Sequence, residues 1–450
     1  MRPLVLGLLL LWPRAGLADY LEVRRNAYIY AEPSRTSQQL DQIQVGQGVP
    51  TVYLYLAGDG LTNGYYRVRL RSGSGTGWIY KTLVRRFPGT PPSAGPGGAA
   101  VLEPGSFDVA SDVMVAHFID VGQGAATLLE FSCGAVLIDA GGEQTDEVNG
   151  TANLLAYLDR LFARRTDLNR TIDLLVLTHA HIDHTRSVPD LIGRYRIRST
   201  FDNGLRSGSG GAQQRRLQDF AAARADVEYQ GIETQDIGGG DGLTNQVIDP
   251  VNCAGTDPRV RVLWGSVDAD PGWSSGAFDN GNNHSVVVRV DFGESSFLFT
   301  GDLQEDAVED LVATYQGTGT LDVDVYQVGH HGSHNGTTRE LMEAMAPAVA
   351  VIAMGNQGLS RATHSAYGYG HPRDEAVEQL RHAEYGVRAR RAEPVTVPVG
   401  ERGACSSCKP PRPPVFANWT IERAIYGTGW EGTVRISARA DGQMRVAAER

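Results

Sequence analysis

The sequence predicts two folded parts, a small all-β module followed by a larger α/β domain. Short runs that alternate apolar and polar residues fill the segment 20–87, as is typical of half-buried strands. A Pro-, Gly- and Ala-rich stretch with almost no charge follows and indicates a linker. Beyond it, fully apolar runs of strand length are interspersed with segments of helical spacing, which favours an α/β domain.

The first eighteen residues have the composition of a secretory signal peptide. Arg2 precedes the apolar run 4–12, and small residues up to Ala18 offer a cleavage site. The run is too short to span a bilayer comfortably, and no later segment of the sequence is long and apolar enough to do so. We therefore expect residues 1–18 to be removed and the mature protein to be periplasmic or secreted. The alternative is an N-terminal membrane anchor.

Residues 19–87 make up the all-β module. Its opening LEVRRNAYIYAEPS and its closing GYYRVRL and GTGWIY resemble the first strand and the last hairpin of bacterial SH3-type domains. That resemblance implies a cell-wall glycan or peptide as a partner, and the alternative is a structural spacer. We place the linker at 88–108 and the second domain at 109–450.

Three histidines and an aspartate follow a predicted buried strand of the second domain. The run 172–177 is apolar and short enough to be a strand, and HAHIDH occupies residues 179–184. A strand that ends there delivers these side chains to the edge of a sheet. Because imidazole nitrogen and carboxylate oxygen suit zinc and similar divalent ions, the spacing predicts a metal site.

HAHIDH resembles the HxHxDH signature of the metallo-β-lactamase superfamily. The segments HFIDVGQGAATLLE at 117–130, VLIDAGG at 136–142, HHGS at 330–333 and YGHP at 369–372 further resemble the metallohydrolase domain of ComEC/Rec2-type competence proteins. The resemblance implies a four-layer αββα metallo-β-lactamase sandwich that includes the C-terminal β-hairpin.

The resemblance also implies a ligand set. In the superfamily the first two histidines of the signature, here His179 and His181, bind one metal ion. The Asp183 carboxylate and His184 bind a second ion. Asp302, which ends the strand-like run 296–300 after a glycine, would bridge the two ions.

Two later motifs complete the expected site. In GHHGS, the superfamily pattern assigns His331 to the second metal and leaves His330 to contact substrate or bound water. His371 of YGHP is expected to be an outer or substrate-contacting group, the alternative being a histidine that stabilises a helix start. Asp183 would also orient the nucleophile, and His330, His371 or a bound water would protonate the leaving group.

The sequence leaves open which residue of the segment 282–285 is a metal ligand. His284 is the only histidine between residues 184 and 302 and precedes a strand-like run, where the superfamily carries a histidine ligand. The ComEC-type pattern NNxS instead puts an asparagine there, which would make His284 a surface residue beside a polar Asn site. Arg186 and Ser187 replace two glycines that usually follow the signature, which adds a cation near the site.

Charge and cysteine content set further limits. The net charge is −11, and the β module carries an excess of Lys and Arg, so the second domain is acidic. An acidic body binds DNA poorly without specific contacts, which counts against a nuclease.

Four cysteines in an exported chain predict disulfides. Three pairings are open, and the nearest is Cys405 with Cys408.

We therefore expect an exported metal-dependent hydrolase in which two divalent ions, zinc or else manganese, activate a shared hydroxide. The expected substrate is a phosphodiester, which would make the protein a phosphodiesterase or nuclease. One alternative is another small hydrolysable substrate, such as a β-lactam, a lactone or another ester or amide. An alternative of a different class is a cell-wall-binding protein whose metal domain is not catalytic.

Overall fold

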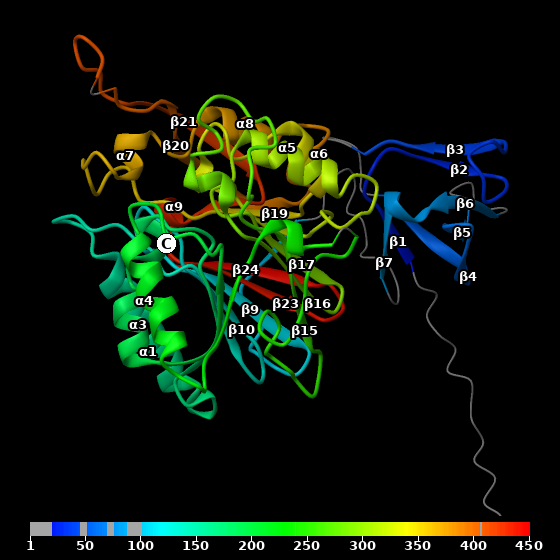
Figure 1. Ribbon diagram of the computed structural model, residues 1–450. Helices are drawn as coiled ribbons and strands as arrows, with labels where there is room; N and C mark the ends of the chain where they lie inside the picture. The colour runs from blue at the N-terminus through cyan, green and yellow to red at the C-terminus, as the bar shows by residue number, and fades with distance from the viewer. Residues whose placement is uncertain (1–19, 46–51, 70–75, 88–100, 239, 406) are drawn as a thin grey trace, which may run out of the picture. The chain divides into compact units, whose positions relative to one another are not determined.

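A computed structural model describes residues 20–45, 52–69, 76–87, 101–238, 240–405 and 407–450 (Figure 1). The described residues fall into two compact units, those up to 87 and those from 101 onwards. The predicted signal peptide, residues 1–18, and residues 88–100 of the predicted linker lie outside the described residues.

The first unit is a seven-stranded sheet in which every neighbouring pair is antiparallel. Apolar side chains such as Leu21, Val23 and Ile29 are buried in a core of its own. The unit is thus all-β, as expected, and its likeness to SH3-type domains stays a prediction. In spatial order the strands are β3 (Gln39–Ile43), β2 (Ala27–Tyr30), β6 (Thr76–Tyr80), β5 (Tyr65–Arg69), β4 (Tyr53–Thr62), β1 (Tyr20–Val23) and β7 (Val84–Phe87).

The second unit contains two large sheets. The first has nine strands, of which β11 to β14 are parallel neighbours. Every residue of β9 and β10 is buried, because both faces of this sheet are covered. The order is β14 (Glu228–Gly231), β13 (Arg196–Asp202), β12 (Thr171–Val176), β11 (Ala135–Ile138), β10 (Thr127–Glu130), β9 (Val113–Phe118), β23 (Val434–Arg439), β24 (Met444–Ala448) and β8 (Glu103–Pro104).

The second sheet has six strands and faces the first across the main apolar core. Phe118 of the first sheet stacks on Phe299 of the second at 6.4 Å between ring centroids. The strands from β17 to β22 are parallel neighbours. Their order is β15 (Pro258–Trp264), β16 (Val287–Phe292), β17 (Ser295–Phe299), β18 (Val325–Gln327), β19 (Val349–Ile352) and β22 (Ile425–Gly427).

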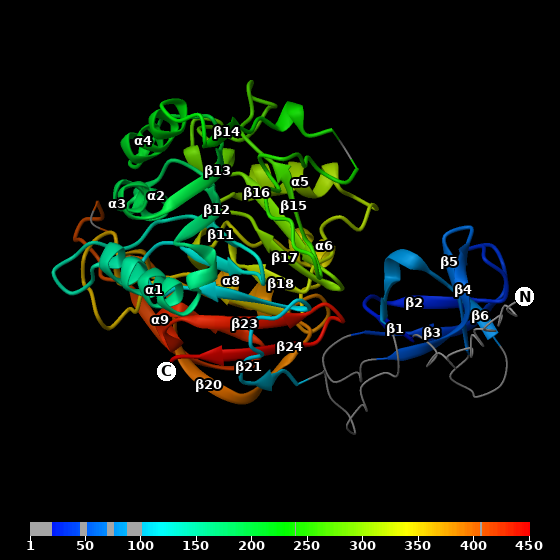
Figure 2. The same cartoon turned by 90° about the horizontal axis from the view of Figure 1, so that it is seen from below.

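Helices cover the outer faces of both sheets, so the layers run helix, sheet, sheet, helix (Figures 1 and 2). On the first sheet lie α1 (Gly150–Arg164), α3 (Val188–Arg194) and α4 (Gly211–Ala222); on the second lie α5 (Glu305–Thr314), α6 (Arg339–Met345) and α8 (Asp374–Arg381). Short helices α2 (Ile182–Thr185), α7 (Ala366–Tyr369) and α9 (Thr428–Glu431) lie in loops. No helix of the described residues is long and apolar enough to cross a membrane.

The spacing of leucines in residues 153–163 predicts a helix with one apolar face, and the helix found there begins earlier. The Asn149 side chain accepts a hydrogen bond from the Ala152 amide and caps the helix, so α1 starts at Gly150. Its predicted apolar face is confirmed, because Leu154, Leu158 and their neighbours are buried against the first sheet.

The C-terminal hairpin expected in the second domain is confirmed, since β23 and β24 pair with each other in the first sheet. Its expected start at residue 424 was wrong, because β22 joins the second sheet beside β19. A long hairpin of β20 (Arg390–Arg402) and β21 (Val415–Arg423) was missed, because prolines obscure its alternation. Part of the predicted linker also belongs to the sandwich, since β8 pairs with β24.

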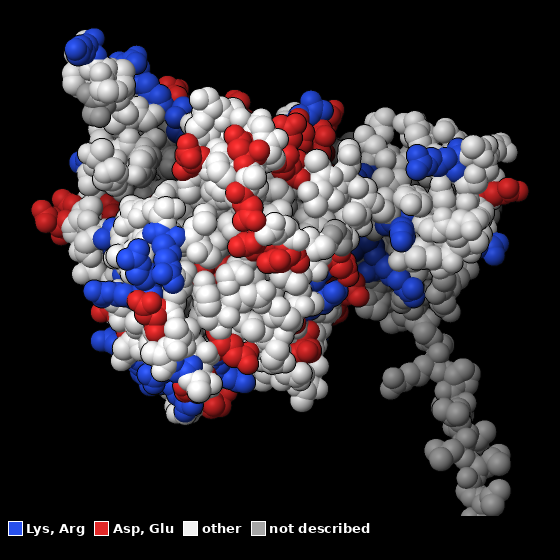
Figure 3. All heavy atoms as spheres, viewed as in Figure 1, with Lys and Arg blue, Asp and Glu red and all other residues white. Residues whose placement is uncertain are grey.

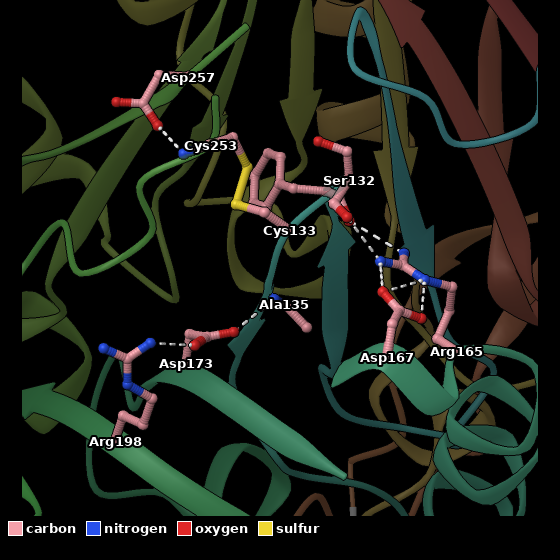
Figure 4. Close-up of a disulfide and its surroundings, with 10 residues drawn as sticks. Ser132, Cys133, Ala135, Arg165, Asp167, Asp173, Arg198, Cys253 and Asp257 are labelled. Carbon is pink, nitrogen blue, oxygen red and sulfur yellow. Dashed lines mark hydrogen bonds and ion pairs between the residues drawn. A yellow bond between two sulfur atoms is a disulfide. The ribbon is translucent and has the colours of Figure 1, made fainter. Parts of the chain in front are cut away.

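Two disulfides join the four cysteines, Cys133 to Cys253 and Cys405 to Cys408. The second pairing is the one expected from sequence proximity. The first connects the turn between β10 and β11 to the segment before β15, and so ties one sheet to the other (Figure 4). Beside it, Asp257 accepts a hydrogen bond from the Cys253 amide, and Arg165 donates one to the Ser132 carbonyl.

Candidate metal centre

Three loops that follow parallel strands bring the predicted ligands together. The HAHIDH segment follows β12, Asp302 follows β17, and His330 with His331 follows β18. Because β12 belongs to the first sheet and β17 and β18 to the second, the ligands meet where the carboxyl edges of the two sheets adjoin. A glycine permits the closest approach, since a Cβ on Gly141 would lie 1.4 Å from the Asp183 carbonyl oxygen.

Four of the predicted residues form a tight cluster. One ligand atom from each of Asp183, His184, Asp302 and His331 lies within 4.8 Å of all the others. The Nε2 atoms of His184 and His331 are 3.0 Å apart. The His184 Nε2 lies 3.2 Å from Asp302 Oδ1, and the His331 Nε2 lies 3.4 Å from Asp183 Oδ2.

Both histidines of this cluster are held by their other ring nitrogen. His184 Nδ1 donates to Asp139 Oδ2 at 2.7 Å, and His331 Nδ1 donates to the Ala353 carbonyl at 2.7 Å. In the neutral rings both Nε2 atoms therefore carry lone pairs that face each other, and two lone pairs repel unless a proton or a cation lies between them. Ligating histidines are oriented in this way, and this donor set of nitrogen and carboxylate oxygen fits a divalent metal such as Zn²⁺ or Mn²⁺.

The charges of the cluster favour a bound cation. Burial alone would raise the pKa of the Asp302 carboxyl, but His184, His331 and His330 hold it well below the usual range. Burial would lower the pKa of His331, but Asp302 and Asp183 raise it to about 10. The buried Asp302 and the half-buried Asp183 thus favour protons on the neighbouring imidazoles, and metal binding must displace those protons.

His179 and His181 form a second pair of histidines next to Asp302. The His179 Nε2 is 3.1 Å from the His181 Nδ1 and 3.8 Å from Asp302 Oδ2. His179 is fully buried, and its Nδ1 is hydrogen bonded to the Thr178 hydroxyl. The Asp302 carboxylate consequently has a histidine nitrogen of each pair within 3.8 Å.

His284 is not brought to the cluster. Its Nδ1 accepts a hydrogen bond from the Val267 amide at 3.1 Å, and its Nε2 donates to the Phe278 carbonyl at 2.7 Å. The backbone therefore occupies both ring nitrogens. The expectation that His284 is a ligand is corrected accordingly, and we omit it from the set proposed below.

His330 lies next to Asp302, and Asn282 lies next to His330. The Asn282 amide nitrogen is 3.4 Å from His330 Nε2, which is itself 3.9 Å from Asp302 Oδ2. The Asn282 side-chain oxygen is buried and has no hydrogen-bond partner among the described residues. A buried polar atom without a partner is costly, so this oxygen is suited to a bound cation or substrate.

The two histidines after β18 have an unusual backbone. His330 and His331 are successive non-glycine residues with φ of 50° and 53°. That left-handed conformation is strained for side chains with a Cβ, and strain of this kind clusters at functional sites. It turns both imidazoles towards Asp302, since the two Nε2 atoms lie 3.9 and 3.5 Å from its Oδ2.

His371 is buried next to the cluster and is held by Gln123, which lies in the Gly-rich DVGQG turn. Gln123 accepts a hydrogen bond from the Gly355 amide with its oxygen and donates one from Nε2 to His371 Nδ1 at 3.2 Å. Burial, with His330 and His331 nearby, lowers the pKa of His371 well below its usual value. The neutral ring therefore carries its proton on Nε2. The DVGQG motif was the only signal for Gln123.

Arg186, the departure from the usual glycine, lies at the end of α2. Its Nε donates to the Gly142 carbonyl at 2.8 Å, which fixes the guanidinium beside the loop that carries Asp183. Burial lowers the pKa of Arg186, and the Asp183 carboxylate opposes that effect. The substitution thus places a cation close to the cluster, as expected.

Comparison with known proteins places this geometry in a family. The family model of the Metallo-beta-lactamase superfamily matches residues 119–355, more than half of the chain. The matched range includes the HAHIDH segment, Asp302, His330 and His331.

Curated relatives match part of the chain. Recombination protein 2 of Haemophilus influenzae is 27% identical over 244 residues, which are 53% of this chain and 24% of the relative. ComE operon protein 3 of Bacillus subtilis is 26% identical over 290 residues, 61% of this chain and 31% of the relative. The chain therefore spans about a quarter to a third of the length of these relatives. The metallo-beta-lactamase fold protein YhfI of Bacillus subtilis matches with 11% identity and a TM-score of 0.34 over 63% of this chain and 97% of YhfI.

Proposed function

The chain belongs to the metallo-β-lactamase superfamily and is a metal-dependent hydrolase, and from this premise we propose that it is an exported phosphodiesterase or nuclease. The observation that carries the proposal is the 3.0 Å separation of His184 Nε2 and His331 Nε2, flanked by Asp183 and Asp302. A cation in that position would satisfy all four groups at once.

We propose a ligand set for two ions. Asp183, His184 and His331 would hold one ion, His179 and His181 would hold the other, and Asp302 lies near both sets. The orphaned oxygen of Asn282 would take the place that the superfamily gives to a histidine. When bound, the ions supply a hydroxide near neutral pH and stabilise charge on the attacked group.

The neighbouring side chains have separate tasks in this proposal. His330 donates from Nδ1 to Asn335 and keeps an Nε2 lone pair towards Asn282 and Asp302, so it accepts a hydrogen bond from substrate or water. Neutral His371 offers an N–H donor, because Gln123 occupies its other nitrogen. Asp183 would also orient the water nucleophile.

The surface charge favours an anionic substrate on one side of the site. Acidic side chains gather over α5 and α6, whereas Lys and Arg gather beside α4 (Figure 3). Arg206, Arg215 and Arg216 are all exposed there. The start of α4 adjoins the first metal position, since the Gly210 amide donates to the Ala180 carbonyl. Exposed acidic residues, Asp146 and Glu147, also lie in the loop after Gly142, whose amide donates to the Asp183 carbonyl. The basic group beside α4, rather than the overall charge of the unit, therefore supports an anionic substrate.

Relatives and disulfides support the remaining parts of the proposal. The relatives are named as a recombination protein and a ComE operon protein, which favours a nucleic acid over a lactam. Two disulfides suit an oxidising compartment, in agreement with the predicted signal peptide. The all-β unit as a binder of cell-wall glycan or peptide stays part of the proposal for an exported protein.

A substrate panel tests the function. The purified protein is assayed on single-stranded DNA, bis-p-nitrophenyl phosphate and nitrocefin, with and without a chelator. We expect chelator-sensitive cleavage of the phosphodiesters, reduced at least about 100-fold by His181→Ala or Asp302→Ala, because both remove direct ligands. His382→Ala, remote from the site and stacked on Tyr385, is the matched control. Turnover of nitrocefin without phosphodiester cleavage would overturn the proposal.

A further inference from the structure

Tyr369 is an exposed aromatic residue beside the metal centre. It is the last residue of α7, and 39% of its surface remains exposed, which is unusual for so large an apolar side chain in this molecule. Exposed aromatic rings at a functional edge are candidates for ligand contact.

Three rings connect Tyr369 to the cluster. The Tyr369 ring stacks on His371 at 5.2 Å between centroids and 26° between planes. The His371 ring in turn stacks on the proposed ligand His331 at 6.4 Å and 28°. The exposed ring is therefore the outermost member of a near-parallel series that begins at the metal centre.

The orientation of the Tyr369 ring is fixed. Its hydroxyl is hydrogen bonded to His364 Nδ1 at 2.8 Å, and the His371 amide donates to the Ala366 carbonyl, which closes the turn that carries both rings. Because one face of Tyr369 rests on His371, the exposed surface belongs to the opposite face and the ring edge. A flat group can stack on that face without any rearrangement.

The same segment also offers a cation. The Arg361 guanidinium lies 4.1 Å from the centroid of the Tyr367 ring, and Arg361 is exposed. Positive charge interleaved with exposed aromatic rings is typical of surfaces that bind single-stranded nucleic acid.

We propose that Tyr369 is the stacking platform for a nucleobase of a single-stranded substrate whose phosphodiester lies at the Asp183, His184, Asp302 and His331 cluster. The inference rests on the proposed phosphodiesterase function and adds the class of substrate: nucleic acid, held by base stacking. Since every base has a π-face, the platform predicts little preference among bases.

The test uses two DNA strands of equal length and equal phosphate number, one with bases and one with abasic tetrahydrofuran residues. Wild type, Tyr369→Ala and Tyr369→Phe are compared for KM and kcat on each strand, and metal content is measured for each protein. We expect wild type to have a KM about tenfold or more lower for the strand with bases. Tyr369→Ala should lose that difference in KM while its metal content stays that of the wild type, and Tyr369→Phe should retain the difference.

Two results would overturn the inference alone: a preference for the base-bearing strand that persists in Tyr369→Ala, or an equal loss on both strands. Absence of cleavage of either strand by a metal-loaded wild type that hydrolyses nitrocefin would show that the proposed function itself has failed, and the stacking role would fall with it.

Discussion

His184 Nε2 lies 3.0 Å from His331 Nε2, although the two residues are 147 positions apart in the chain. Both rings are held by hydrogen bonds from Nδ1, so neither can turn its lone pair away. Zn–N bonds of about 2.0–2.1 Å at tetrahedral angles separate two ligand nitrogens by roughly 3.3 Å. The two nitrogens are therefore close to the spacing that a tetrahedral metal requires of its ligands.

Asp139 provides a first prediction, because it holds a ligand without contacting the metal position. Its carboxylate accepts from His184 Nδ1 and from the Thr178 amide and hydroxyl. Asp139→Asn should weaken binding of the second metal by about 10- to 100-fold, since partners of ligating histidines typically contribute this much. Titration with Zn²⁺ followed by calorimetry measures the effect. An unchanged affinity would mean that Asp139 only stabilises the turn.

A substitution at Gln123 tests whether His371 acts as a proton donor. Gln123→Leu keeps the side-chain volume but removes the donor that occupies His371 Nδ1, so the neutral ring can shift its proton away from Nε2. We expect kcat to fall by about tenfold or more with metal content unchanged, since general acid–base groups contribute 10²–10⁴. Asn356→Ala, which changes a nearby side chain bonded to the Gly429 carbonyl, is the control. Equal activity of Gln123→Leu and wild type would remove His371 from the mechanism.

The disulfide between Cys133 and Cys253 should stabilise the sandwich. It closes a segment of 120 residues between the two sheets (Figure 4), and loops of this length correspond to about 4–5 kcal/mol by chain entropy. Replacing both cysteines by serine should lower the free energy of unfolding by about 2–5 kcal/mol, measured by urea denaturation under non-reducing conditions. The matched pair Cys405→Ser with Cys408→Ser, only three residues apart, should cost much less. Similar losses for both pairs would contradict this account.

The ion pairs of Glu130 should make the stability of the fold depend on pH, independently of the metal centre. Burial alone would raise its pKa, but a hydrogen bond from His117 and the guanidiniums of Arg165 and Arg164 lower it to about 2. Ionised Glu130 therefore stabilises the fold fully above its ordinary pKa of 4.5, and this contribution is lost as the pH falls towards 2.

The corresponding variant is Glu130→Gln. It should lower the free energy of unfolding by about 2–4 kcal/mol at pH 7, because Arg165 would lose a buried partner. The difference from wild type should shrink between pH 4.5 and the lowest pH at which the protein still folds. A difference that stays constant over this range would show that the carboxylate charge does not contribute.

The sequence predicted the parts of the site that depend on strand endings. HAHIDH, Asp302 and His331 each follow an apolar run directly, so their convergence could be inferred from local pattern and family resemblance. His284 shows where that inference ends. It lies before a strand, where the superfamily carries a ligand, but hydrogen bonds with the backbone of Val267 and Phe278 hold its ring. These contacts cannot be predicted from the local sequence.

Other parts of the site depend on contacts between distant segments. Gln123 reaches His371 across 248 positions, and its surroundings predicted only a turn. The local sequence of Asp139 similarly indicates only a Gly-rich turn, and its hydrogen bond with His184 is visible only in the folded structure. Supporting residues of this kind are defined by tertiary packing, so the ligands could be predicted before the groups that orient them.

The central claim is that this chain holds two metal ions through two sets of side chains joined by Asp302. The most direct measurement is the metal content of the purified protein after reconstitution with Zn²⁺ or Mn²⁺ and removal of the excess. We predict two equivalents per chain for wild type and for His382→Ala, one for His331→Ala, and fewer than one for Asp302→Ala. A wild-type protein that retains no metal, or a content that His331→Ala and Asp302→Ala leave unchanged, would contradict the claim.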